Sequence, residues 1–268
     1  MARYDEVTDP ADPRLDDFRD LTAADRRPDR PGGRGLVIAE GVPVVRRLIA
    51  SPYPIRAVLG VPARVDALRP ELDPLPVPVH AVSADLMAQV VGFHLNRGVL
   101  AAADRAPQPD LDTLLGAARR VVVCEGINDH ENLGALFRNA AALSADAILF
   151  GPRCADPLYR RSVRVSMGHV LRVPFADLPA YGWPAGLDVL RRNGFRTLAL
   201  TPRIPYAELS TVDRSAKLAL LLGAEGPGLS DAALAAADAR VAIPMAPGVD
   251  SLNVATAAAI ALYVLRTP

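Results

Sequence analysis

Three polar segments in the second half of the chain carry the side chains best suited to bind a polar ligand. They are INDHENLGALFRN (127–139), LLGAEGPGLS (221–230) and IPMAPGVDSLNVATAAAI (243–260). Their candidate groups are a cation, a carboxylate, a hydroxyl and two amides, on Arg138, Glu225, Ser251, Asn132 and Asn253. The second segment surrounds its only charge with glycines, which let backbone amides approach a ligand closely.

Each of these segments begins within or at the end of an apolar run and leads into a helical pattern. The runs are RVVVCEGI (120–127), LALLLGAEG (218–226) and VAIPM (241–245). Strands as continuously apolar as these are covered on both faces, which is typical of a parallel sheet. Ligands of open α/β sheets bind at the carboxyl edge of the strands. We therefore expect an α/β, doubly wound second half with one site built from the three segments.

The first half also shows an α/β pattern. Strands and helices are expected to alternate at 35–41, 42–50, 55–61, 83–92 and 98–103, which predicts a small α/β sandwich. A seam rich in proline and aspartate at 106–112 is the best candidate for a linker. It predicts two domains, 1–107 and 113–268. The acidic first 20 residues are expected to be a flexible lead.

Composition limits the classes of protein. The 268 residues hold 30 basic and 30 acidic side chains, so no global field draws the chain to nucleic acid, although a local patch can suffice. Two cysteines, Cys124 and Cys154, cannot build a disulfide framework and favour a reducing cytoplasm. The acidic start is not a signal peptide. No apolar run is long enough for a membrane span.

Simpler roles stand beside the chemical ones. Glycines after a strand often serve only a turn, and Ser251, Asp129 or Asn132 could each cap a helix. Helix periodicity is expected to bury Leu133, Leu136 and Phe137 and to leave Asn132, Arg138 and Asn139 toward the loop edge. An arginine held inside the core would instead need a partner. The glycine segment is neither a dinucleotide fingerprint nor a P-loop, and no nucleophile elbow occurs. Three histidines lack metal-ligand spacing, so no metal is expected: His80, His94 and His169.

Taken together, NLGALFRN, LLGAEGPGLS and IPMAPGVDSLNVATA resemble, in order and spacing, the three motifs of the SpoU (TrmH-type) family of RNA 2′-O-methyltransferases in the SPOUT superfamily. The similarity covers about residues 120–265. The earlier stretches EGVPVVRRLIASPYPIRAVLG and FHLNRGVLAAA resemble the smaller L30e-like RNA-binding domain that precedes that catalytic domain.

The resemblance implies a C-terminal trefoil knot, which neither composition nor periodicity could indicate. It implies S-adenosylmethionine as cofactor, bound in a bent shape by the knotted loops. The positions that match its contacts are Thr201, Gly223, Gly226, Ile243, Leu252 and Asn253. It also implies a homodimer with the sites at the subunit interface. A long apolar helix expected at 252–265 suits that interface or a monomer core equally.

For catalysis, the resemblance implies methyl transfer from a sulfonium to a ribose 2′-hydroxyl, with roles for Arg138, Asn132, Glu225, Ser251 and Asn253. The family mechanism gives the arginine a part in deprotonation. A guanidinium stays charged in proteins, so a donor that orients the ribose or its phosphate and stabilises the developing alkoxide needs fewer assumptions. Glu225 is expected to hold Arg138 in place.

RNA contact is expected from a run of arginines that follows a strand, Arg153, Arg160, Arg161 and Arg164, although a solvated helix face would look the same. A weaker basic cluster lies at 26–34. An rRNA substrate is favoured over a tRNA. Alternatives are a non-catalytic RNA-binding protein of the same fold, a SPOUT enzyme that modifies a base, and another nucleotide-binding α/β domain.

Overall fold

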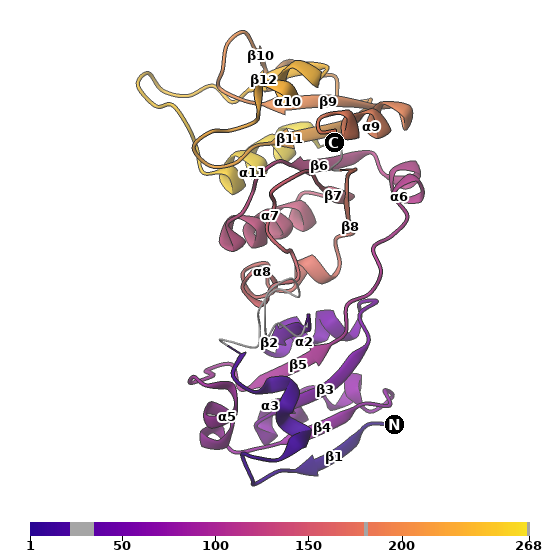
Figure 1. Cartoon of the computed structure of the whole chain (residues 1–268), viewed down its shortest axis with the longest axis vertical. Helices are drawn as coiled ribbons and strands as arrows, with labels where there is room; N and C mark the ends of the chain where they lie inside the picture. Colours follow the sequence, from indigo (N-terminus) through magenta and orange to yellow (C-terminus); the bar gives the residue numbers. More distant parts are fainter. Residues whose placement is uncertain (22–34, 180–181, 267–268) are drawn as a thin grey trace. The chain divides into compact units, whose positions relative to one another are not determined.

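The computed structural model describes residues 1–21, 35–179 and 182–266. The chain divides into two compact units (Figure 1). Unit 1 comprises residues 1–107 and 156–172, and unit 2 comprises 108–155 and 173–268. The first division falls in the expected seam, whereas the return of 156–172 to unit 1 has no signal in the sequence. The basic cluster expected at 26–34 lies outside the described residues.

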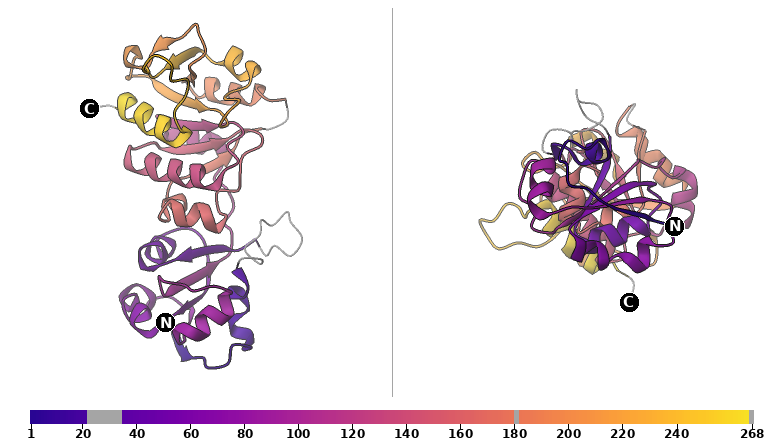
Figure 2. Two further views of the ribbon diagram at one scale, coloured as in Figure 1. Left: turned by 90° about the vertical axis from the view of Figure 1, so that its left-hand side faces the viewer. Right: turned by 90° about the horizontal axis from the view of Figure 1, so that it is seen from below.

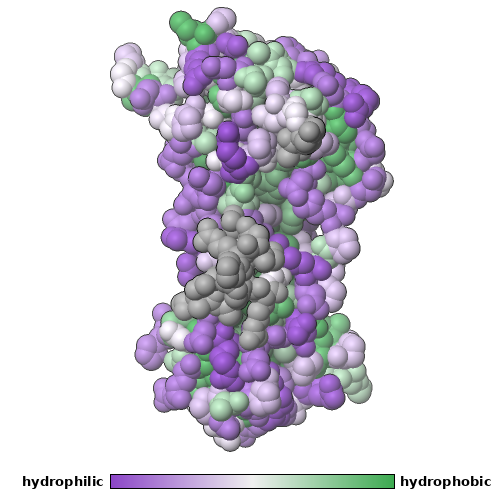
Figure 3. All heavy atoms as spheres, in the orientation of Figure 1, coloured by the Kyte–Doolittle hydropathy of each residue, from purple (hydrophilic) through white to green (hydrophobic). Residues whose placement is uncertain are grey.

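Unit 1 contains a five-stranded sheet in the order β1-β4-β3-β5-β2. The strands are β1 (Arg3–Glu6), β2 (Val37–Glu40), β3 (Ile55–Gly60), β4 (Pro78–Ala81) and β5 (Val99–Ala103). β1, β4 and β3 run parallel, and β5 is antiparallel to both β3 and β2. Figure 3 shows hydrophilic side chains interspersed with apolar ones on the face of this unit that is in view.

The helices of unit 1 are α2 (Val42–Ile49), α3 (Pro62–Asp66), α4 (Arg69–Leu72), α5 (Ala84–Val91) and α8 (Arg160–Val165). Local chemistry sets the bounds of α5: the Ser83 hydroxyl accepts a hydrogen bond from the Leu86 N–H at 3.1 Å, and Gly92 ends the helix at a φ of +84°. α8 packs against β2.

The acidic start of the chain belongs to the fold of unit 1, so the expectation of a flexible lead is wrong for residues 3–18. β1 pairs in parallel with β4, and a short 3₁₀ helix (Pro13–Phe18) follows. Leu15 and Phe18 on that helix are fully buried. The acidic side chains that suggested a solvated tail instead form ion pairs, with Asp5 and Asp12 both bound to Arg14.

Unit 2 contains a seven-stranded sheet in the order β10-β12-β9-β11-β6-β7-β8. The strands are β6 (Arg120–Cys124), β7 (Ala147–Phe150), β8 (Phe175–Asp177), β9 (Phe195–Leu200), β10 (Ala207–Glu208), β11 (Lys217–Leu222) and β12 (Ala239–Ala242). Every neighbouring pair is parallel. The parallel α/β sheet predicted from the apolar runs is therefore confirmed.

Helices cover both faces of this sheet. They are α6 (Leu111–Ala117), α7 (His130–Ala142), α9 (Asp188–Arg192), α10 (Asp231–Ala236) and α11 (Val254–Leu265). Leu115, Leu190 and Leu234 pack with one set of alternating strand residues, which places α6, α9 and α10 on one face. Phe137 of α7 contacts Phe150 on the other face, where α11 runs beside α7 (Figure 2).

Candidate active site

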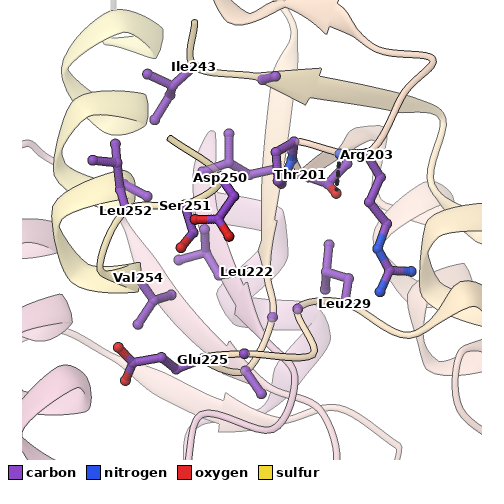
Figure 4. A pocket seen from close by; sticks show the side chains of 18 of the residues that line it. Thr201, Arg203, Leu222, Glu225, Leu229, Ile243, Asp250, Ser251, Leu252 and Val254 are labelled. Carbon is purple, nitrogen blue, oxygen red and sulfur yellow. Dashed lines mark hydrogen bonds between the residues drawn. The ribbon is translucent and has the colours of Figure 1, made fainter. Parts of the chain in front are cut away.

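A cavity of about 420 Å³ lies in unit 2, beyond the carboxyl ends of β9, β11 and β12 (Figure 4). The residues after β9, the glycine loop (223–229) and the loop that enters α11 (243–253) form its wall. The cavity is lined by all six residues whose resemblance implied cofactor contact: Thr201, Gly223, Gly226, Ile243, Leu252 and Asn253. Glu225 and Ser251 also line it.

The glycine loop closes so tightly that its first residue must be glycine. A Cβ on Gly223 would lie 2.1 Å from backbone atoms of Gly228 and Leu229, and backbone atoms cannot yield as a flexible side chain can. Gly226 and Gly228 have φ values of +87° and +72°, in the left-handed region that favours glycine. The loop therefore brings backbone amides and carbonyls to the cavity wall.

A line of amides joins the three sequence segments. Asn253 is the N-cap of α11, and its Oδ1 accepts hydrogen bonds from the backbone N–H groups of Ala255 and Thr256. That fixes its Nδ2 as a donor, which reaches Asn132 Oδ1 at 2.7 Å. The Asn132 Nδ2 in turn donates to Glu225 Oε2 at 3.1 Å. Each segment thus orients the next.

The capping roles left open by the sequence are now assigned. Asp129 caps α7, since its Oδ1 accepts from the N–H groups of Glu131 and Asn132, both at 2.8 Å. Asn253, and not Ser251, caps α11. Neither Asn132 nor Ser251 therefore caps a helix: the Asn132 amide links Asn253 to Glu225, and Ser251 lines the cavity.

Arg138 agrees with one expectation and departs from another. Its side chain is exposed, as expected, because the apolar positions of α7, Leu133, Leu136 and Phe137, turn the opposite face of the helix to the core. The expected pairing with Glu225 is wrong, since that carboxylate accepts from Asn132. Within the part of the chain that the structure describes, Arg138 forms no hydrogen bond or ion pair, so its guanidinium is open to a ligand.

Sequence reasoning missed Arg203, a cavity residue that follows β9. Its Nη1 lies 2.7 Å from Asp231 Oδ1, and its Nη2 donates to the Pro227 carbonyl at 3.0 Å. The backbone N–H of Arg203 also donates to Thr201 Oγ1 at 3.1 Å. The side chain spans from the β9 loop to the glycine loop. A cation just after an apolar strand was the available signal.

Glu125 is a second missed residue. It follows β6, is only 2% exposed, and accepts hydrogen bonds from Trp183 Nε1 at 2.7 Å and from the Ser230 N–H at 3.0 Å. Ser230 caps α10 directly after the glycine loop. The buried carboxylate therefore anchors the end of that loop, and a single acid at the end of an apolar strand could have indicated it.

The arginines expected to contact RNA divide between the two units. Arg153 belongs to unit 2 and its side chain is 75% exposed, whereas α8 carries the other three in unit 1. No sequence signal indicated that the run of arginines is divided between the two units in this way. Arg160 lies 3.3 Å from Glu40 and over the ring of Phe93. Arg161 is exposed and Arg164 is half-buried.

The two cysteines are both free thiols. Burial raises the pKa of Cys124 well above its ordinary value and also raises the pKa of Cys154. A protonated thiol is a poor nucleophile, so neither supports covalent catalysis. Among the described residues, no group of His, Cys, Asp and Glu side chains suits a metal ion, and no helix is long and apolar enough to cross a membrane.

The chain belongs to the SpoU rRNA Methylase family, whose model matches residues 119–263, more than half of the sequence. The resemblance in the three motifs is therefore confirmed. An uncharacterized tRNA/rRNA methyltransferase of Mycobacterium tuberculosis is 57% identical over 263 residues, which cover 96% of this chain and 90% of that protein.

Other relatives are more distant. The 23S rRNA (guanosine(2553)-2′-O)-methyltransferase RlmP of Bacillus subtilis is 34% identical over 156 residues, covering 57% of this chain and 60% of that one. The crystal structure of an AdoMet-bound rRNA methyltransferase from Sinorhizobium meliloti shares the fold, with a TM-score of 0.83, 24% identity and coverage of 98% and 97% of the two chains.

Proposed function

We propose that unit 2 transfers a methyl group from S-adenosylmethionine to a ribose 2′-hydroxyl of structured RNA, with rRNA favoured over tRNA. The observation that carries the proposal is the line of hydrogen bonds from Glu225 through Asn132 to Asn253, beside the cavity. Membership of the SpoU family and the ribose 2′-O activity named for the relative RlmP support the same reaction.

The cavity fits the proposed cofactor. Its volume of about 420 Å³ falls within the range of small-molecule sites. Residues 223–229 of the glycine loop line the cavity, so their backbone groups can reach the adenine edge. The apolar side chains of Ile243 and Leu252 offer surfaces to the ring. When bound, the sulfonium supplies an electrophilic methyl group and leaves as a neutral thioether.

The chain's own groups then bind and orient the ribose. Arg138 remains protonated, donates to the ribose or its phosphate, and stabilises negative charge on the attacking oxygen. One carboxylate oxygen of Glu225 accepts a hydrogen bond from Asn132, which leaves the other oxygen to accept a hydrogen bond from the ribose hydroxyl. Ser251 completes the hydrogen bonds of the hydroxyl. Alignment alone contributes several kcal/mol, up to about 7–11 in the best cases.

Further parts of the proposal concern assembly. The exposed apolar side chains of Ile260 and Tyr263 lie three residues apart on one face of α11, which supports a homodimer through this helix. The chain passes from β11 across β9 to β12 and then returns to α11 beside α7, a path that supports the C-terminal knot. Unit 1 is the proposed RNA-binding domain, and the cytoplasm is the proposed compartment.

The test is transfer of labelled methyl groups from S-adenosylmethionine to unmodified rRNA and tRNA pools, followed by nucleoside analysis. A 2′-O-methylnucleoside in one pool supports the reaction and identifies the class of RNA. A methylated base would favour the base-modifying alternative. If the cofactor binds but neither pool is methylated, the assay is repeated with assembled ribosomal subunits. Absence of transfer there as well would favour a non-catalytic RNA-binding protein. Absence of both binding and transfer would exclude the enzyme.

A further inference from the structure

Charge in the cavity is unbalanced. Its charged lining residues are Arg203, Glu225 and Asp250. The Arg203 guanidinium is matched by Asp231, which lies 2.7 Å away and does not line the cavity. Glu225 accepts a hydrogen bond from a neutral amide, and Asp250 forms no hydrogen bond or ion pair with any residue in the described ranges. Two lining residues therefore carry carboxylates without a cationic partner in the described part of the chain, and of these Glu225 is held by Asn132.

Asp250 is an exposed residue that lines the cavity, so its charge can act on a ligand there. It belongs to the loop that enters α11, where a turn closes with a hydrogen bond from the Val249 N–H to the Ala246 carbonyl at 3.1 Å. Figure 4 shows its carboxylate near Ser251, among the lining side chains, while the Glu225 side chain extends from the glycine loop in another direction. Since Asn253 caps α11, Asp250 has no capping duty there.

We infer that Asp250 makes the cavity prefer the cationic sulfonium cofactor over its neutral thioether product; this inference rests on the proposed function. Methyl transfer removes one positive charge from the bound molecule and leaves its adenosine and amino-acid parts unchanged. Apolar and backbone contacts bind both forms alike, so they cannot separate substrate from product. A carboxylate without a protein cation attracts only the charged form more strongly, which favours release of the product.

The experiment measures the dissociation constants of S-adenosylmethionine and S-adenosylhomocysteine by calorimetry on the full chain. Asp250→Asn removes the charge and keeps the size of the side chain, Asp250→Glu keeps the charge, and Asp188→Asn removes an exposed carboxylate of α9 that does not line the cavity. We expect Asp250→Asn to weaken sulfonium binding about five- to tenfold at low salt, with thioether binding unchanged. Asp250→Glu and Asp188→Asn should keep the wild-type ratio.

The outcomes separate the inference from the proposed function. Equal weakening of both ligands by Asp250→Asn would show that the carboxylate acts on a part that the two ligands share, such as the ammonium group, or that it serves the loop. No change in either would show that the carboxylate does not act on the ligand. Either result overturns the inference and leaves the proposed function intact. A wild-type chain that binds neither ligand would overturn the proposed function, and the inference with it.

Discussion

The ion pairing of charged side chains differs between unit 1 and the surroundings of the cavity in unit 2. In unit 1, arginines and acids pair with one another. The pairs are Arg14 with Asp5 and Asp12, Arg56 with Asp17 and Asp104, Arg105 with Asp156, and Arg160 with Glu40. Around the cavity of unit 2, Arg138, Glu225 and Asp250 have no ionic partner within the described residues.

This difference separates charges that serve the fold from charges that serve a ligand. A surface ion pair adds little to stability, but each charged group in it is already occupied by its partner. An unpaired charge beside a cavity has no partner in the fold and is open to a ligand. The absence of ionic partners among the residues that the structure describes therefore distinguishes Arg138, Glu225 and Asp250 from paired residues such as Arg203, and each prediction below tests one side of the contrast.

The largest effect is expected at Arg138. Arg138→Ala should lower the rate of methyl transfer at least about 100-fold, because it removes a charged donor from the developing alkoxide. Its exposure predicts an unchanged melting temperature, and its position outside the cavity lining predicts unchanged cofactor affinity. Single-turnover transfer measures the rate, and calorimetry measures the melting temperature and the cofactor affinity. Arg192→Ala, at an exposed site on α9, is the matched control. A variant with near wild-type rate would remove Arg138 from the mechanism.

Much of unit 2 could be predicted from sequence because its signals are local. Continuous apolar runs predicted parallel strands, and Thr201, Gly223 and Leu252 follow or flank such strands, so the sheet topology gathers them at one edge. The partners of polar groups were harder to predict. The Asn132–Glu225 hydrogen bond joins residues 93 positions apart, and no pattern along the chain could distinguish it from the expected Arg138–Glu225 pair.

Unit 1 shows where local pattern misleads. The acidic composition of the first residues predicted a solvated lead, yet two apolar side chains, Leu15 and Phe18, bury the segment in the core. Likewise, the arginines of α8 predicted a solvated or RNA-facing helix, while Arg160 is held by Glu40 from a strand 120 residues earlier. In both cases contacts that are distant in the sequence decide the structure.

The next largest effect is expected from breaking a pair in unit 1. Glu40 is 6% exposed and faces Arg160 at 3.3 Å and Arg97 at 3.8 Å. Glu40→Gln should lower the free energy of unfolding by about 1–2 kcal/mol, because the half-buried Arg160 loses the charge of a buried partner while an amide oxygen remains to accept from it. Methyl transfer per folded molecule should not change. Urea unfolding measures the free energy of unfolding. Asp104→Asn is the control, because Asp104 is half exposed beside Arg56 and its loss should change stability little. A loss of turnover without loss of stability would contradict the assignment of this pair to the fold.

A smaller effect is expected from the remaining arginines of α8. Since Glu40 holds Arg160, the double variant Arg161→Ala/Arg164→Ala tests the RNA contact. RNA affinity should fall several-fold, and the slope of log affinity against log salt should shrink by about 0.7–0.9 for each phosphate that the variant no longer neutralises. Arg46→Ala, which removes a cation paired with Glu71 at 2.6 Å in the same unit, should leave the slope unchanged. Equal slopes for all three proteins would make the α8 arginines a solvated face.

The smallest effect extends the contrast into unit 2 itself, because Asp238 is fully engaged by the fold. Burial alone would raise the pKa of Asp238, but hydrogen bonds from the Thr197 N–H and Oγ1–H and the charge of Arg191 lower it below the ordinary 3.8. A carboxyl whose pKa is lower in the folded state stabilises the fold above its unfolded pKa, and this contribution is lost as the pH falls through the folded value. Wild type should therefore be more stable than Asp238→Asn at pH 7, with the gap closing in acid below the ordinary pKa. Chemical unfolding of both proteins across that range measures the gap. A stability difference that is constant with pH would mean that the hydrogen bonds of Asp238, and not its charge, hold Thr197. The charge of Asp238 would then add nothing to the fold, against the contrast drawn between paired and unpaired charges.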